Sequence, residues 1–89
     1  MNHYEFEVFA KGTLHYLSTW ECDAETEQIA VMQYIHQLSD LSICEDEYEI
    51  ARSRAIIEKL AGKEYEVEPC DGYITITAVL TIDEVDRFI

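Results

Sequence analysis

The most constraining feature of this sequence is a β-hairpin signature in its C-terminal half. Two segments, 64–68 and 73–80, alternate apolar with polar residues, and Asp71-Gly72 lies between them. A period of two indicates strands with one buried face, and Asp-Gly is a preferred two-residue hairpin loop. The predicted cross-strand pairs are Val67 with Ile76, Tyr65 with Ala78, Glu66 with Thr77 and Glu68 with Thr75. Pro69 lacks an amide hydrogen, so we expect its strand at an edge of the sheet.

A first hairpin is predicted near the N-terminus, where an alternating strand over 3–10 and a second strand over 13–20 flank the turn Lys11-Gly12. Two registers compete. A two-residue loop pairs Val8 with His15 and Glu7 with Tyr16, which mixes the two faces. We adopt a loop of Ala10-Lys11-Gly12, with Gly12 left-handed in a bulge, because it keeps the faces consistent. Its pairs are Val8 with Leu14, Phe6 with Tyr16 and Glu7 with His15, and its apolar face holds Tyr4, Phe6, Val8, Leu14 and Tyr16.

Two amphipathic helices are predicted between the hairpins. Asp23 is a good N-cap for the first, which the apolar spacing carries to about Leu38. Its predicted inward residues are Val31, Ile35 and Leu38, flanked by Ile29, Met32 and Tyr34. The second begins at a capping box over 42–45 and runs to Ala61, with Gly62 as the stop signal. Its predicted inward residues are Ile50, Ile57 and Leu60.

The order of elements predicts the fold class. Thr81 and Glu84 have the spacing of another capping box, which opens a short last helix with Ile82, Val85, Phe88 and Ile89 available for packing. The order ββααββα predicts a two-layer α+β domain over 1–89, in which antiparallel hairpins form a sheet and the helices pack on one face of it. Whether the two hairpins join into one sheet stays open at this point.

The charge of the chain excludes several classes of partner. Six Lys and Arg against nineteen Asp and Glu give a formal net charge of −13. Such a chain repels a nucleic-acid backbone and an anionic membrane, so we expect neither as a direct partner. The cysteines, Cys22, Cys44 and Cys70, form no Cys-x-x-Cys pair, which favours a reducing, cytoplasmic setting. The N-terminus lacks the layout of a signal peptide, and no apolar run is long enough to span a bilayer.

The sequence contains no catalytic motif, and we expect no enzymatic activity, no cofactor and no metal. An acid/base pair of carboxyls needs one of them in an apolar setting, whereas nearly every Glu falls at a solvent-facing position. The acidic cluster 45–49 lacks the spacing of a calcium loop, and compensation of a helix dipole explains it better. Cys44 has no histidine near it in sequence. We interpret His15 as a cross-strand partner of Glu7, and His36 as an exposed or rim residue of the first helix.

The pattern of the acidic residues is the strongest functional signal. Each hairpin carries a row of glutamates on its outer face, and the corner between the first hairpin and the first helix carries a further acidic group. The rows are Glu5 with Glu7, and Glu64 with Glu66 and Glu68; the corner holds Glu21, Asp23, Glu25 and Glu27. Alternate residues on a strand lie about 6.6 Å apart, so each row is a regular line of negative charge. The alternative interpretation is that these side chains only keep the strands soluble and protect the sheet edges.

The segment Trp20-Glu-Cys-Asp-Ala-Glu-Thr-Glu-Gln-Ile-Ala30 is similar to the acidic strand-into-helix corner of small phage-borne domains. With its small size and strong negative charge, the chain resembles the compact inhibitors of phages and mobile elements, notably anti-CRISPR proteins and anti-restriction DNA mimics. The resemblance implies a class of function without assigning residues. It implies a non-enzymatic protein that binds a nucleic-acid-handling complex, for example a CRISPR effector, in the cytoplasm of a host cell.

We therefore interpret the chain as an acidic inhibitor whose glutamate-rich surface binds a basic, nucleic-acid-binding groove. The predicted contact residues are Glu5, Glu7, Glu21, Glu25, Glu64, Glu66 and Glu68, with Tyr73 or Trp20 as aromatic anchors. One alternative is a homo-oligomeric structural or accessory protein, such as a homodimer, with Trp20, Tyr73, Phe9 and Leu17 in its interface. The other is a small-molecule binding module, which would need a concave site with a perturbed carboxylate.

Overall fold

The computed structural model describes residues 1–13, 15–40 and 46–89. Four strands and three helices follow one another in the predicted order ββααββα. The strands are β1 (Asn2–Ala10), β2 (Tyr16–Ala24), β3 (Glu66–Cys70) and β4 (Tyr73–Leu80). The helices are α1 (Glu27–Ser39), α2 (Glu47–Ala61) and α3 (Ile82–Asp86). Within these ranges no helix is both long enough and apolar enough to cross a membrane.

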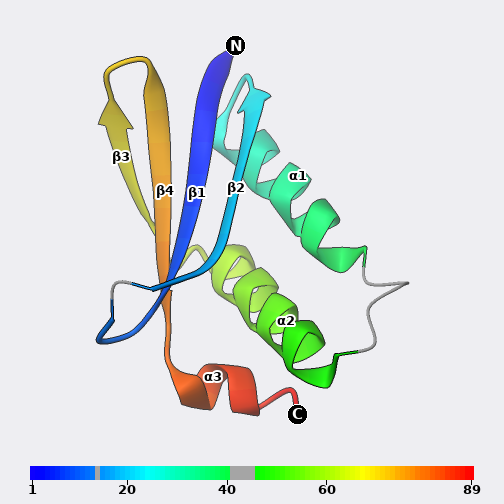
Figure 1. Cartoon of the computed structure of the whole chain (residues 1–89). Helices are drawn as coiled ribbons and strands as arrows, with labels where there is room; N and C mark the ends of the chain where they lie inside the picture. The colour runs from blue at the N-terminus through cyan, green and yellow to red at the C-terminus, as the bar shows by residue number, and fades with distance from the viewer. Residues whose placement is uncertain (14, 41–45) are drawn as a thin grey trace.

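The two hairpins join into one four-stranded sheet of order β2-β1-β4-β3. Each hairpin is antiparallel, but β1 and β4 pair in parallel at the centre, so the sheet is mixed rather than antiparallel throughout. A parallel pair needs a long connection between its strands, and here the connection includes α1 and α2. Figure 1 shows both helices on one side of the sheet, with α3 beyond the far end of β4. The predicted two-layer α+β architecture is confirmed.

The register of the second hairpin is confirmed. Val67 lies opposite Ile76, and Glu66 and Glu68 lie opposite Thr77 and Thr75. β3 is an edge strand, as Pro69 requires. The pairing begins at Glu66, however, so the expected pair of Tyr65 with Ala78 is not part of the ladder. Tyr65 instead donates a hydrogen bond from its hydroxyl to Oε2 of Glu27, at 2.9 Å.

The register predicted for the first hairpin is wrong. Phe6 lies opposite Trp20 rather than Tyr16, and Glu7 lies opposite Thr19 rather than His15. The observed register buries Ala24 and half-buries Trp20 and Cys22 beneath the helices, while Tyr16 stays exposed. Gly12 does have the predicted left-handed conformation, with φ of 81°. The predicted pair of Val8 with Leu14 is replaced by Val8 opposite Ser18, and residue 14 itself lies outside the described residues.

The start of α1 also differs from the prediction. Asp23 is not its N-cap, because β2 continues through this residue to Ala24. The N-cap is Thr26, whose hydroxyl accepts a hydrogen bond from the Ile29 amide at 3.2 Å. α1 ends at Ser39, one residue beyond the expected end.

The second helix ends at Ala61 with Gly62 as its C-cap, as predicted. The capping box expected over 42–45 lies outside the described residues. The N-cap of α2 is Asp46, whose carboxylate accepts hydrogen bonds from the amides of Tyr48 and Glu49. The box at Thr81 and Glu84 is confirmed at the start of α3. Its Glu84 carboxylate also forms an ion pair with Lys59 on α2, which ties α3 to the helical layer.

The core lies between the sheet and the two long helices. β1 and β4 supply Tyr4, Phe6, Val8, Ile76, Ala78 and Leu80, and the helices supply Ala30, Val31, Tyr34, Ala51, Ala55, Ile56 and Leu60. Of the predicted inward residues, Val31 and Leu60 are buried, and Ile35, Leu38, Ile50 and Ile57 are half-buried. Tyr34 is the centre of an aromatic cluster: its ring lies 4.5 Å from that of Phe6 and stacks on that of Trp20 at 5.3 Å.

We predict that Tyr34→Ala lowers the free energy of unfolding by about 3–5 kcal/mol, because it leaves a cavity between Phe6 and Trp20. Met32→Ala is the matched control, since Met32 lies on the same helix and is 68% exposed. The control should change stability by less than about 0.5 kcal/mol. Urea unfolding of both variants tests this, and equal losses would contradict the assigned core.

We also predict a pH-dependent contribution from Glu84. The interaction with Lys59, followed by the hydrogen bond from the Thr81 amide, lowers the pKa of Glu84 below its ordinary value of 4.5. A lowered folded-state pKa stabilises the fold above pH 4.5, and the contribution disappears as the pH falls through the folded value. Glu84→Gln keeps an acceptor for the capping box but loses the charge, so it should cost about 0.5–1 kcal/mol at neutral pH.

Urea unfolding at neutral pH and at successively lower pH measures the difference between parent and Glu84→Gln. The difference should vanish at acid pH, where the parent carboxyl is also neutral. A difference that stays constant across the acid range would show that the charge of Glu84 does not contribute.

Candidate functional site: the open face of the sheet

The face of the sheet opposite α1 and α2 is here called the open face, and none of the helices that the structure describes covers it (Figure 1). Successive side chains of a strand point to opposite faces, so the residues that alternate with the core residues lie on this side. On β1 the core residues are Tyr4, Phe6 and Val8, which leaves His3, Glu5 and Glu7 on the open face. The cross-strand pairing then assigns the residues of the other three strands.

Three of the four strands each place two carboxylates on the open face. They are Glu5 and Glu7 on β1, Glu21 and Asp23 on β2, and Glu66 and Glu68 on β3. β4 contributes Thr75 and Thr77, which pair with the glutamates on both sides. Adjacent strands lie about 4.8 Å apart and alternate residues about 6.6 Å apart, so the carboxylates form a two-dimensional array. The parallel pairing of β1 with β4 brings the two predicted glutamate rows onto one surface.

No Lys or Arg neutralises this array from within the sheet. In the part of the chain that the structure describes, all six basic residues lie outside the strands: Lys11, Arg52, Arg54, Lys59, Lys63 and Arg87. Three of them form ion pairs with glutamates of the helical layer, namely Arg52 with Glu49, Lys59 with Glu84 and Arg87 with Glu58. The six carboxylates of the open face thus have no Lys or Arg on their strands, whereas three glutamates of the other layer are paired with a basic side chain.

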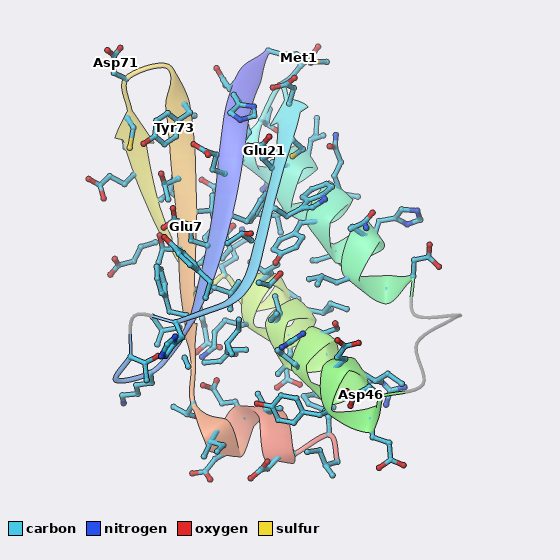
Figure 2. The ribbon with its side chains drawn as sticks, viewed as in Figure 1. Met1, Glu7, Glu21, Asp46, Asp71 and Tyr73 are labelled. Carbon is cyan, nitrogen blue, oxygen red and sulfur yellow. The ribbon has the colours of Figure 1, made fainter. Side chains whose placement is uncertain are left out.

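A shallow hollow of about 580 Å³ lies on the open face between β1 and β2. Its lining includes the side chains of Glu5, Glu7 and Glu21, together with Tyr16 and Thr19. Figure 2 shows Glu7, Glu21 and Tyr73 over the strands. A hollow lined by three carboxylates suits the end of a Lys or Arg side chain.

Two side chains on this face, His3 and Tyr73, have a raised pKa. A hydrogen bond with Asp23 raises the pKa of His3 above its ordinary value of 6.5, and Glu21 adds to the effect. Interaction with the Cys70 side chain raises the pKa of Tyr73, and the charges of Glu5 and Glu7 raise it further. Tyr73 is 38% exposed, which leaves its ring available for contact beside the carboxylates.

Not every predicted contact residue lies on this face. Glu64 precedes β3 and Glu25 follows β2; both are exposed, but neither is in the array. Trp20 lies on the opposite face of β2, half-buried against Phe6 and Tyr34. Residue 45 of the acidic cluster over 45–49 lies outside the described residues. Asp46 is the N-cap of α2 and Glu47 its first residue, where negative charge compensates the helix dipole.

Sequence reasoning missed the role of His3 and Asp23. The imidazole Nδ1 of His3 lies 2.8 Å from Oδ1 of Asp23, and its Nε2 lies 3.4 Å from Oε2 of Glu21. His3, Glu5 and Glu21 also place ligand atoms within 4.8 Å of one another. The alternation of Thr19, Glu21 and Asp23 with Trp20, Cys22 and Ala24 was the signal that could have found this cluster.

Two of the three cysteines lie within the described residues. Cys22 and Cys70 are both half-buried free thiols, as expected for small semi-buried residues. Burial raises the pKa of Cys22, and the charge of Asp23 raises it further, so the thiolate is disfavoured. The third cysteine, Cys44, lies outside the described residues.

We predict that the open face costs stability through repulsion among its carboxylates. Glu7→Gln should raise the free energy of unfolding by about 0.3–1 kcal/mol at low ionic strength, and the gain should shrink in about 0.5 M NaCl. Glu47→Gln removes the same charge from the first turn of α2, where the helix dipole favours it, and should instead be destabilising. Unfolding of the three proteins at both salt concentrations tests the difference in sign, and a destabilising Glu7→Gln would contradict it.

Comparison of the chain with family models, curated proteins and solved structures finds no match.

Proposed function

We propose that this protein is a non-enzymatic inhibitor whose open face binds a basic, nucleic-acid-binding surface of another protein or complex. The observation that carries the proposal is an array of carboxylates on one sheet face, to which the described strands contribute no Lys or Arg: Glu5, Glu7, Glu21, Asp23, Glu66 and Glu68. A groove that binds a phosphate backbone is lined with Lys and Arg, and a rigid array of carboxylates is complementary to it.

The strand scaffold favours this type of contact in two ways. The carboxylates lie on paired strands, so their spacing is held by backbone hydrogen bonds and little order has to be imposed on binding. Neighbouring charges also lie within about one Debye length, 8 Å, of each other at physiological salt, so they act on a partner together. Association would be fast and would weaken steeply with salt.

Aromatic side chains at the margin of the array would supply the apolar part of the contact. Tyr73 lies on the open face beside Glu5 and Glu7, and Tyr16 lines the acidic hollow. Tyrosine is favoured at interfaces because its ring is rigid and its hydroxyl can pair with polar groups. Trp20, the other predicted anchor, faces the helical layer and would not take part in the same contact.

One observation favours the alternative of a homo-oligomer. A hollow of about 560 Å³ on the helical side is lined by Trp20, Ile29 and Met32 with Gln33, His36 and Gln37. Met32 is 68% and Ile29 41% exposed, so this surface offers apolar area to a second copy. It lies on the layer opposite the acidic array, and the two proposals therefore predict different sensitive residues.

We predict that a Glu7→Gln, Glu66→Gln and Glu68→Gln triple variant binds the partner at least about tenfold more weakly than the parent. The matched control removes three charges from exposed helix positions: Glu47→Gln, Asp83→Asn and Asp86→Asn. The control should bind within about twofold of the parent, because it has the same net charge as the triple variant but an intact open face.

The partner is captured with the immobilised protein from a lysate of the host cell, and elution with duplex DNA is compared with elution by salt. Affinities are then measured with the purified partner. Release by both DNA and salt, with loss of binding in the open-face variant alone, supports the proposal. Equal binding by the open-face variant and the parent would overturn it. A stable dimer in light scattering, with no partner captured, would favour the homo-oligomer.

A further inference from the structure

The N-terminal end of β1 and the facing part of β2 bring one imidazole and two carboxylates together on the open face. His3 and Glu5 are alternate residues of β1, and Glu5 lies directly opposite Glu21 on β2. One ligand atom from each of the three side chains lies within 4.8 Å of the other two. His3 is 36% and Glu21 66% exposed, so an ion can reach these atoms from solvent.

The spacing of these atoms matches the coordination sphere of a small transition-metal ion. Zinc binds imidazole nitrogen and carboxylate oxygen at about 2.0–2.2 Å, so two such ligands of a tetrahedral ion lie about 3.4 Å apart. Nε2 of His3 and Oε2 of Glu21 are separated by 3.4 Å. The ligand atom of Glu5 lies within 4.8 Å of the other two, and a side-chain adjustment would bring it to the same ion.

Asp23 orients the imidazole for this role. Its carboxylate oxygen lies 2.8 Å from Nδ1 of His3 and accepts the hydrogen of that nitrogen. In the neutral ring the lone pair is then on Nε2, the atom that faces Glu21. A carboxylate on the outer nitrogen of a ligating histidine is the usual second contact in zinc sites, where it fixes the ring and increases its basicity.

The negative charge of Glu5 and Glu21 also favours binding of a cation. Glu5 and Glu21 are a like-charged pair directly opposite each other, an arrangement that is destabilising in a sheet. Among the described strand residues there is no Lys or Arg to offset them. The nitrogen ligand distinguishes the cluster from calcium and magnesium sites, whose ligands are oxygen atoms.

We propose that His3, Glu5 and Glu21 bind one divalent transition-metal ion of the zinc class, with Asp23 as the positioning residue of His3. Three protein ligands leave a coordination position for water. This site shares Glu5, Glu21 and Asp23 with the array of the proposed function, but the two are tested separately, because the open-face test variant changes Glu7, Glu66 and Glu68 and leaves His3, Glu5, Glu21 and Asp23 intact.

Zinc chloride is titrated into the tag-free, metal-free chain by calorimetry, in a buffer that does not coordinate metals. We expect saturation at one ion per chain. His3→Gln and Glu21→Gln should each weaken binding by at least about tenfold, and Asp23→Asn by about tenfold through the outer contact. The cobalt(II) complex should show the visible absorption of a low-coordinate N/O site, which His3→Gln removes.

Four controls exclude other zinc ligands. His36→Gln changes an exposed histidine on α1, and Glu7→Gln changes the next open-face carboxylate of β1. Cys70→Ser removes a thiol that lines the same hollow as His3 and Tyr73. Extra residues ahead of Met1 convert its amine to an amide and move the terminal amine away from the site. All four proteins should bind zinc within about twofold of the parent.

The proposal is overturned if the parent shows no saturable binding, if His3→Gln retains the parent's affinity, or if any of the four controls loses binding as His3→Gln does. Far-ultraviolet circular dichroism of the metal-free variants establishes that they are folded. Should His3→Gln fail to fold, Glu21→Gln and Asp23→Asn decide the outcome in the same way.

Discussion

The parallel pairing of β1 with β4 is the contact on which the rest of this structure depends. Each hairpin alone would be a two-stranded ribbon with little stability of its own. Joined along β1 and β4, they form a sheet whose inner face presents Tyr4, Phe6, Val8, Ile76, Ala78 and Leu80 to the helices. The same pairing places the glutamates of both hairpins on the opposite face. Core and acidic surface are thus two consequences of one register.

Repulsion among the carboxylates of the open face opposes folding, and we expect the effect to be largest on β1. Glu5 and Glu7 lie on a central strand and are only half exposed, where repulsion is less screened than at an edge. The basic residues that could have relieved it lie in the helical layer or in the connections. The aromatic cluster around Tyr34, which is 1% exposed, and the ion pair of Lys59 with Glu84 are among the contacts that offset this repulsion.

The register of the second hairpin could be predicted because Asp71-Gly72 sets the loop length, and the loop length sets the register; the start of β3 at Glu66, which leaves Tyr65 unpaired with Ala78, could not. In the first hairpin, Gly12 indicated the conformation of one turn residue but not the length of the connection. The observed register therefore differs from the predicted one. In the observed register β2 extends to Ala24. Asp23, which was predicted to cap a helix, therefore lies in β2 and contacts His3. Pairing of β1 with β4 is non-local, and no local pattern specifies it. The rows of the site were therefore predictable, whereas their assembly on one face and the His3 cluster were not.

The position of the acidic residues bears on the choice between solubility and recognition. Solubility of a small domain needs a net charge of only about 2–8, and it is served equally well by charges in loops and on helices. Here the net charge is −13, and part of it occupies paired central-strand positions where it opposes folding. Edge protection explains Glu66 and Glu68 on β3 but not Glu5 and Glu7 on β1, which has a strand on either side. Neither solubility nor edge protection requires carboxylates at these positions. A binding surface does require them, because recognition of a partner depends on those charges in that geometry.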